Sequence, residues 1–253
     1  MARGGARASR AAPAGPALAP QQNACAALTG LVGGVAGAAE AAAAEGVTER
    51  LVALLREPSS RTTAGPNVLE TISALASAGG LGTDAALVAG APAAVVGACF
   101  CVFLRAAKLR CNRERSRVAP ADTVRLAAEA PHDAEHALAE AAADAACALA
   151  SSGAACAAAL REAGAVPAMA ALLGHASSET RVRALLGLSM LLSERSAAEA
   201  LISAPLALSR IRAMAAAPQC DSDGTDGDES AIAGDLLAAL SSAPGLSQLL
   251  VEA

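Results

Sequence analysis

The feature of this chain that most constrains its fold is a pattern that recurs about every 40 residues. The segment 46–55 (GVTERLVALL) aligns without gaps on 164–173 (GAVPAMAALL), 118 residues later, a distance of about three units of 39. A further copy lies at 85–96, where Gly90 follows Gly46 by 44 residues. Such a period is typical of stacked supersecondary units, so the chain is predicted to have a repeat architecture.

The repeated segments carry the hydrophobic period of helices. Leu208, Ile211 and Met214 recur every third residue, and apolar side chains in 182–190 follow the i, i+3, i+4, i+8 pattern. The apolar residues are mostly Ala, Leu and Val, with two Phe and neither Trp nor Tyr. Close packing of helices on small side chains fits this composition better than a β-sandwich does.

Composition also narrows the classes of function. A hydrophobic fraction of 54% excludes a disordered chain, and a net charge of −5 gives no overall field that attracts phosphate backbones. Nucleic acid is therefore not an expected partner. The seven cysteines are scattered and odd in number, which predicts reduced thiols and a cytoplasmic protein.

One stretch resembles a known repeat family. LREAGAVPAMAALL (160–173), followed by VRALLGLSMLL (182–192), is similar to armadillo repeats, with a short helix, a Gly turn at Gly164, Pro167 in the first turn of the next helix, and then a further helix. The resemblance implies an all-α, armadillo/HEAT-like right-handed solenoid of about five irregular repeats. It also implies a non-catalytic scaffold or adaptor that binds a protein or peptide along a groove.

In armadillo proteins the third helix of each unit lines that groove. By this resemblance the lining helices here are 48–57, 92–108, 166–175 and 205–216. The polar residues expected to face the groove are Arg50, Arg56, His175, Arg210 and Arg212. The importin-alpha branch of the family reads basic peptides with repeated Trp and Asn, and because this chain has no Trp, a nuclear-import receptor is not predicted.

The chain divides into a tail and a repeat domain. Residues 1–22 predict a disordered tail, or a transit segment that would direct the protein to an organelle, and 23–253 the repeat domain. Within that domain, 105–132 is a degenerate unit and 217–229 an acidic loop insertion. The final repeat match stops at residue 253, where another helix would begin, so an uncapped end that forms a homodimer is one expectation.

A second hypothesis attaches the protein to a membrane. Residues 85–104 contain no charge, have the length of a membrane span, and precede a basic run, although the turn at Gly90 favours two short buried helices instead. The segment 85–117 would be the membrane-binding part. The basic run is a candidate docking patch for acidic lipids or acidic protein, and its cations are Arg105, Lys108, Arg110, Arg113, Arg115 and Arg117.

An enzyme is not predicted, and no cofactor or metal is assigned. His132 and His136 bracket Glu135 in the pattern of inverted zinc peptidases, which leaves a zinc hydrolase as a distant alternative. The acidic run 221–230 lacks the register of a calcium loop, since Asp226 stands where Gly is required.

Overall fold

The computed structural model describes residues 18–102, 130–204, 206–217 and 225–242, and these residues form helices joined by short turns, with no strand among them. In chain order the helices are α1 (Leu18–Gly34), α2 (Ala38–Ala44), α3 (Val47–Arg56), α4 (Pro58–Thr63), α5 (Gly65–Ala78), α6 (Gly80–Ala89), the unlabelled helix Ala91–Val102, α9 (Ala130–Ser151), α10 (Ala154–Glu162), α11 (Ala165–Leu172), α12 (Ser178–Leu191), α13 (Arg195–Ser203), α14 (Ala207–Ala215) and α15 (Thr225–Ser242).

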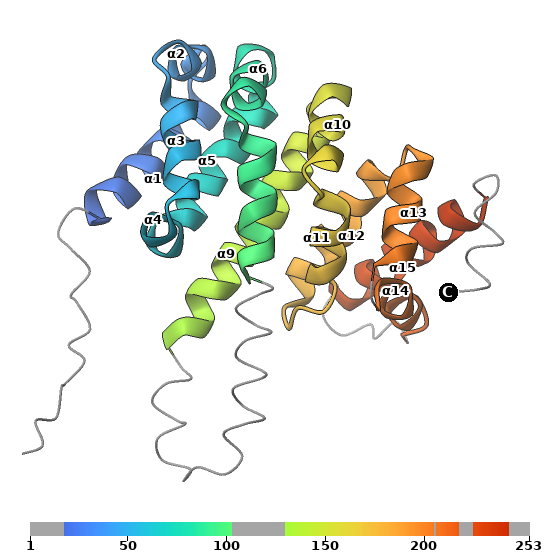
Figure 1. Cartoon of the computed structure of the whole chain (residues 1–253). Coiled ribbons are helices and arrows are strands. Elements are labelled where there is room, and N and C mark those ends of the chain that lie inside the picture. The colour runs from blue at the N-terminus through green and yellow to red at the C-terminus, as the bar shows by residue number, and fades with distance from the viewer. Residues whose placement is uncertain (1–17, 103–129, 205, 218–224, 243–253) are drawn as a thin grey trace, which may run out of the picture.

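After α1, the described chain repeats one order of helices four times: two shorter helices, which we assign in turn to a short row and a middle row, and then a long helix. Figure 1 shows the result as three rows. The long helices α1, α5, α9, α12 and α15 follow one another, and each contacts the next. The middle row is α3, helix 91–102, α11 and α14, and the short row is α2, α6, α10 and α13. The predicted all-α solenoid of irregular repeats is confirmed; its described part has four such units after α1, with α4 as an added turn in the first.

The turn before each middle helix has the same backbone conformation. Gly46, Gly90 and Gly164 have φ of 66°, 76° and 86°, in the left-handed region that glycine adopts without a Cβ penalty. Leu206 takes this position in the last unit, with φ of 60°. The Gly turn predicted at Gly164 is therefore confirmed.

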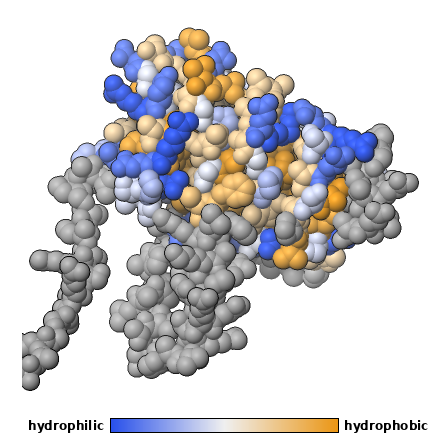
Figure 2. Space-filling model, viewed as in Figure 1, coloured by the Kyte–Doolittle hydropathy of each residue, from blue (hydrophilic) through white to orange (hydrophobic). Residues whose placement is uncertain are grey.

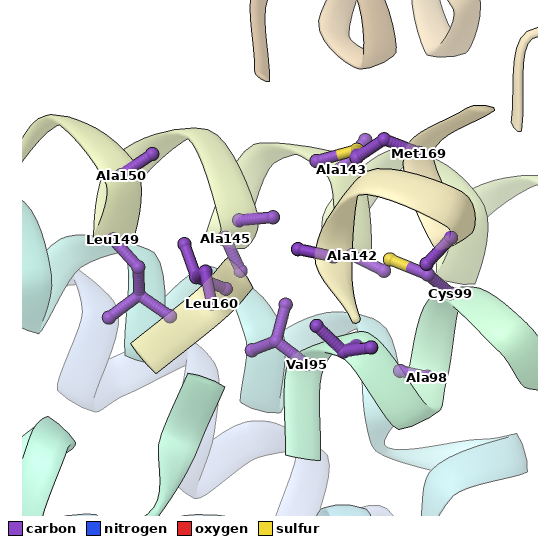
Figure 3. Packing of buried hydrophobic residues seen from close by; sticks show 14 of the residues in the cluster. Val95, Ala98, Cys99, Ala142, Ala143, Ala145, Leu149, Ala150, Leu160 and Met169 are labelled. Atoms are coloured by element: carbon purple, nitrogen blue, oxygen red, sulfur yellow. The ribbon is translucent and has the colours of Figure 1, made fainter. Parts of the chain in front are cut away.

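One continuous apolar core runs through the rows, and α9 lies at its centre. Ala139, Ala142, Ala143 and Ala145 are fully buried, and their small side chains allow neighbouring helices to approach α9 closely. Figure 3 shows Val95 and Cys99 of helix 91–102 gathered with side chains of α9, α10 and α11. Because each unit buries its apolar face only against its neighbours, the stack is held together by this shared core.

Two predicted boundaries are corrected by the helices. Helix α1 begins at Leu18, so residues 18–22 are helical rather than part of a tail. The acidic loop was predicted to reach residue 229, but α15 begins at Thr225 and Glu229 is buried within it. At the start of α1, Gln22 donates to Thr63 O and its own carbonyl oxygen accepts from Asn67, so this segment is tied to the following unit. At the start of α15, Glu229 pairs with Arg181 of α12 in the preceding unit. Residues 1–17 and 103–129, which include the basic run 105–117 and most of the degenerate unit, lie outside the described residues, as does the C-terminal end 243–253.

The candidate membrane segment is split in the structure. Helix α6 ends at Ala89, Gly90 turns the chain, and helix 91–102 continues at 65° to it, so two short helices form as the turn at Gly90 favoured. Ala91, Val95 and Cys99 are at most 1% exposed. Among the described residues no single helix has the length and apolarity of a membrane span, although this bent pair and the pair α10 and α11 pass the test together.

Candidate interaction surface

Of the five residues predicted to face a groove, four lie on helices of the middle row and the fifth, His175, follows one. Arg50 and Arg56 are exposed on α3 in the first unit, and Arg210 and Arg212 are on α14 in the last. His175 follows α11 and is half-buried. Figure 2 shows the face of the middle helices with an apolar centre, where helix 91–102 and α11 carry no charged residue. The middle row therefore presents no continuous line of polar side chains.

The long helices, in contrast, form an unbroken row. Each contacts the next from α1 to α15, whereas α11 and α14 of the middle row scarcely touch. Among residues whose side chains are described, the long helices carry eight carboxylates and two guanidinium groups, and the middle helices one carboxylate and four guanidinium groups. The long-helix row is thus the continuous surface of the stack, and it is acidic.

The acidic charge is concentrated around Arg183 of α12. Its Nη1 donates to Glu140 Oε1 at 3.0 Å and lies 2.9 Å from Glu179 Oε1, and its Nε pairs with Asp144. The three carboxylates, which we call the Arg183 cluster together with Arg183, are 42–47% exposed, while the Arg183 side chain is 22% exposed. Three anions around one cation leave a local charge of −2 that solvent can reach.

The environment of Asp144 reflects this surplus. Burial raises the pKa of the Asp144 carboxyl, the charge and hydrogen bond of Arg183 oppose that rise, and the nearby Glu140 and Glu179 add to it. A further cation placed here would relieve the repulsion among the carboxylates. The cluster is therefore suited to receive a basic group.

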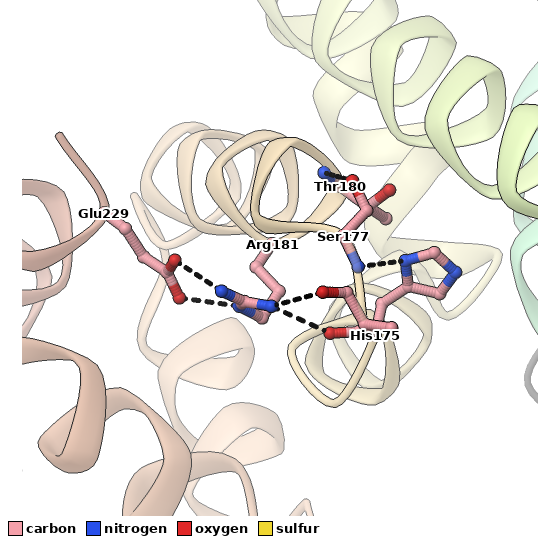
Figure 4. A network of polar contacts seen from close by, with 6 residues as sticks. His175, Ser177, Thr180, Arg181 and Glu229 are labelled. Atoms are coloured by element: carbon pink, nitrogen blue, oxygen red, sulfur yellow. Dashed lines mark hydrogen bonds and ion pairs between the residues drawn. The ribbon is translucent and has the colours of Figure 1, made fainter. Parts of the chain in front are cut away.

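A second polar network joins the last two units. Arg181 of α12 donates through Nε and Nη2 to the two carboxylate oxygens of Glu229 on α15, at 2.7 and 2.8 Å. Its Nη1 donates to the carbonyl oxygens of His175 and Ala176, at 3.0 Å each (Figure 4). The Glu229 side chain is only 9% exposed, so this is a buried, bidentate ion pair between neighbouring units.

The network continues into α9 through two histidines. The rings of His175 and His136 meet edge to face, with centroids 4.6 Å apart. Burial, together with the charges of the adjacent His136 and Arg181, lowers the pKa of the His175 imidazole to about 4. His175 is therefore neutral near pH 7 and occupies a joint between helices, rather than a groove surface.

Of the two histidines of the hypothetical zinc site, only His136 has a side chain within the described residues. His136 contacts His175, while the side chain of His132 lies outside the described residues. Within the described part of the chain, no three His, Cys, Asp or Glu side chains are grouped as metal ligands. The five described cysteines are free, and burial raises the pKa of the Cys99 and Cys147 thiols to about 12, so these two thiols are not reactive near neutral pH.

Comparison with solved structures shows which known architecture this is. A computationally designed armadillo repeat protein for modular peptide recognition superimposes with a TM-score of 0.63, at 20% identity over 91% of this chain and 80% of the other. The chain has an armadillo-like repeat fold. A designed armadillo repeat protein in complex with the peptide (KR)4 gives a TM-score of 0.54, at 18% identity over 94% of both chains. No protein-family model and no curated protein matches the sequence of this chain.

Reasoning from the sequence missed the Arg183 cluster and the Arg181–Glu229 pair. Part of the signal is local, because Glu140 and Asp144, like Glu179 and Arg183, stand four residues apart and so share a helix face. The pairing between helices is not local, since Arg183 and Glu140 are 43 residues apart and Arg181 and Glu229 are 48 apart. Only the stacking of units brings them together.

Proposed function

We propose that this armadillo-like chain is a non-catalytic scaffold that binds an extended, basic peptide segment of a partner protein along its long-helix row. The observation that carries the proposal is the Arg183 cluster, where three solvent-accessible carboxylates surround one guanidinium group. Lysine and arginine side chains of a bound segment would supply the missing positive charge.

The position of the cluster supports this proposal. It joins α9 and α12 near the middle of a row of long helices that runs through the whole stack, so an extended segment would meet further carboxylates on both sides. Glu70 of α5 and Asp235 of α15 are exposed on the same row. The (KR)4 peptide bound by a designed armadillo repeat protein is of the same chemical class. Recognition here would rest on carboxylates, because the chain has no Trp.

Fluorescence anisotropy with a labelled (KR)4 peptide tests the proposal directly. We expect saturable binding by the full chain at low salt, and at least a 5-fold loss of affinity in the double variant Glu140→Gln/Glu179→Gln, since charged contacts at an exposed surface contribute modestly and are screened by salt.

The matched control is Glu49→Gln/Glu162→Gln. It removes the same charge from exposed positions on the middle and short rows, at α3 and α10. This control should bind within 2-fold of the unmodified chain. Equal losses in the two variants would mean that only net charge is being read, and would overturn the proposed surface.

A further inference from the structure

A pocket of about 450 Å³ lies where the last two units meet, apart from the Arg183 cluster. Its walls come from the end of α11, the start of α12, the last turn of α14 and the start of α15. Met214, Ala213 and Ala217 give it apolar surface above Leu173, which is only 2% exposed. Its polar residues are Arg181, Arg210, Glu229 and Ser230.

Three of these four polar residues are already engaged by the protein. Both carboxylate oxygens of Glu229 accept from Arg181, and Arg181 also donates to two backbone carbonyls. The Ser230 hydroxyl donates to Ala215 O at 3.3 Å. Among the described residues that line the pocket, Glu229 is the only one with a carboxylate, and one of the two guanidinium groups neutralises it.

Arg210 is the fourth polar residue of the pocket wall. Its guanidinium packs against Gly174, so closely that a Cβ on Gly174 would lie 2.7 Å from Arg210 Cζ and Nη2 and 2.9 Å from Nη1. Arg210 is half-buried, and among the residues that the structure describes its guanidinium makes no hydrogen bond or ion pair. The packing against Gly174 restricts where the Arg210 guanidinium can point. Its planar donors match a carboxylate in geometry.

The position of Arg210 has a structural benefit as well, because a cation beside the last turn of α11 is favoured by the helix dipole. That benefit explains why an arginine is stable here, but not why its donors line an open pocket with apolar walls. A pocket with surplus positive charge and apolar surface suits an anion that carries an aliphatic group.

We propose that this pocket binds a carboxylate attached to a short branched aliphatic group, with the carboxylate on Arg210 and the aliphatic group against Met214 and Ala213. Such a group occurs at the end of a peptide chain with an aliphatic last residue and in a free short-chain acid. The site goes beyond the proposed basic-peptide surface, because it takes the opposite charge and involves none of the Arg183 cluster.

NMR titration of the ¹⁵N-labelled full chain with N-acetyl-L-leucine, against N-acetyl-L-leucinamide, tests the site. The two probes share their aliphatic part and differ in the carboxylate. We expect saturable shifts with the acid, with a Kd on the order of 1 mM for a ligand of this size, and at least 5-fold weaker binding of the amide. Equal binding of acid and amide, or no saturable binding of the acid, would overturn the proposal.

Variants and a second acid complete the test. Arg210→Gln should lose at least 5-fold in affinity for N-acetyl-L-leucine, while Arg212→Gln, which changes an exposed arginine two residues along α14 that does not line the pocket, should match the unmodified chain. Circular dichroism checks that both variants fold. Tighter binding of N-acetyl-L-leucine than of 4-methylpentanoate supports a peptide chain end as the ligand, and the reverse order supports a free acid. An Arg210→Gln variant that binds N-acetyl-L-leucine as well as the unmodified chain refutes the site.

Discussion

At the scale of single residues, the turn before each middle helix imposes the strictest requirement. Gly46, Gly90 and Gly164 meet it with positive φ at no steric cost, but Leu206 occupies the same conformation with a side chain. The left-handed region costs a residue with a Cβ about 1–2 kcal/mol. Leu206 is also 66% exposed, so its side chain recovers little of that cost by burial.

Replacing Leu206 by glycine should therefore stabilise the chain. We expect Leu206→Gly to raise the free energy of unfolding by about 0.5–1 kcal/mol, the relief of backbone strain being partly offset by the greater entropy of the unfolded chain. Urea denaturation followed by circular dichroism measures the shift in midpoint. The companion variant Gly164→Ala should shift the midpoint in the opposite direction, and a destabilised Leu206→Gly chain would contradict the argument.

The half-buried His175 makes the stability of the folded chain depend on pH. The folded-state pKa of His175 is about 4, below the ordinary value of 6.5, so the folded chain resists a proton that the unfolded chain accepts. The contribution of His175 to stability is present above pH 6.5 and is lost as the pH falls toward 4. We expect a loss of about 1 kcal/mol over that window, discounted for partial exposure of the ring.

The comparison that isolates this effect uses His175→Asn. Asparagine supplies a neutral acceptor for the Ser177 backbone N–H, which His175 Nδ1 accepts at 3.3 Å. Urea midpoints of the two chains, measured between pH 7 and 4.5, should fall less steeply for the variant. Parallel curves would show that other groups carry the acid dependence.

At the scale of elements, α12 shows that apolar periodicity predicts a helix without predicting which of its side chains are buried. The predicted apolar stripe was Val182, Leu185, Leu186 and Met190. Leu185 is buried, yet Leu186 and Met190 are 37% and 39% exposed. The other buried apolar side chains, Ala184, Leu188 and Leu191, lie outside that stripe. Helix α12 packs against α9, α11 and α15, so its buried face is wider than one stripe and is set by three neighbours. The sequence supplied the helix but not its orientation. By contrast, Leu208 and Ile211 of the predicted stripe on α14 are buried.

The packing of α6 on α5 depends on a missing side chain. A Cβ on Gly82 would lie 2.7 Å from the backbone oxygen of Leu75, which cannot move without shifting α5. Gly82→Ala should therefore lower the free energy of unfolding by about 1–3 kcal/mol, as overpacking does elsewhere. Thermal and urea unfolding measure the change.

Gly97 provides the control for this substitution. It lies within helix 91–102, and a Cβ there would meet nothing within 4 Å. Gly97→Ala should be neutral or stabilise by up to about 1 kcal/mol, because alanine has the higher helix propensity. Equal effects of the two substitutions would mean that helix propensity, and not the contact with Leu75, determines the result.

At the scale of the whole molecule, the stack is held by contacts between neighbouring units. The last unit meets the one before through α12 and α15, where the Arg181–Glu229 pair is buried beside the apolar contacts. Each unit contributes its own stability and an interface term, so a weakened interface at one end affects that end first.

Glu229→Gln tests the interface between the last two units. Removing one partner of a buried ion pair leaves the other uncompensated, and we expect a loss of about 3–5 kcal/mol at the interface. Hydrogen exchange should then show α14 and α15 opening while α5 and α9 stay protected. The control Glu199→Gln removes an exposed ion pair with Arg195 and should change stability by less than about 0.5 kcal/mol. Uniform loss of protection along the chain would contradict a unit-by-unit stack.

The sequence by itself determined the features that rest on local chemistry. These are the helices, the period near 40 residues, the glycine turns before the middle helices, and the break at Gly90 that divides the apolar segment. Each follows from backbone conformation or from side chains a few positions apart. The tertiary structure alone decided which row of helices is continuous, where the start of α15 lies, and which side chains meet around Arg183 and Arg181. The contacts Arg183–Glu140 and Arg181–Glu229 join residues 43 and 48 positions apart, so they depend on how the units stack rather than on any local preference.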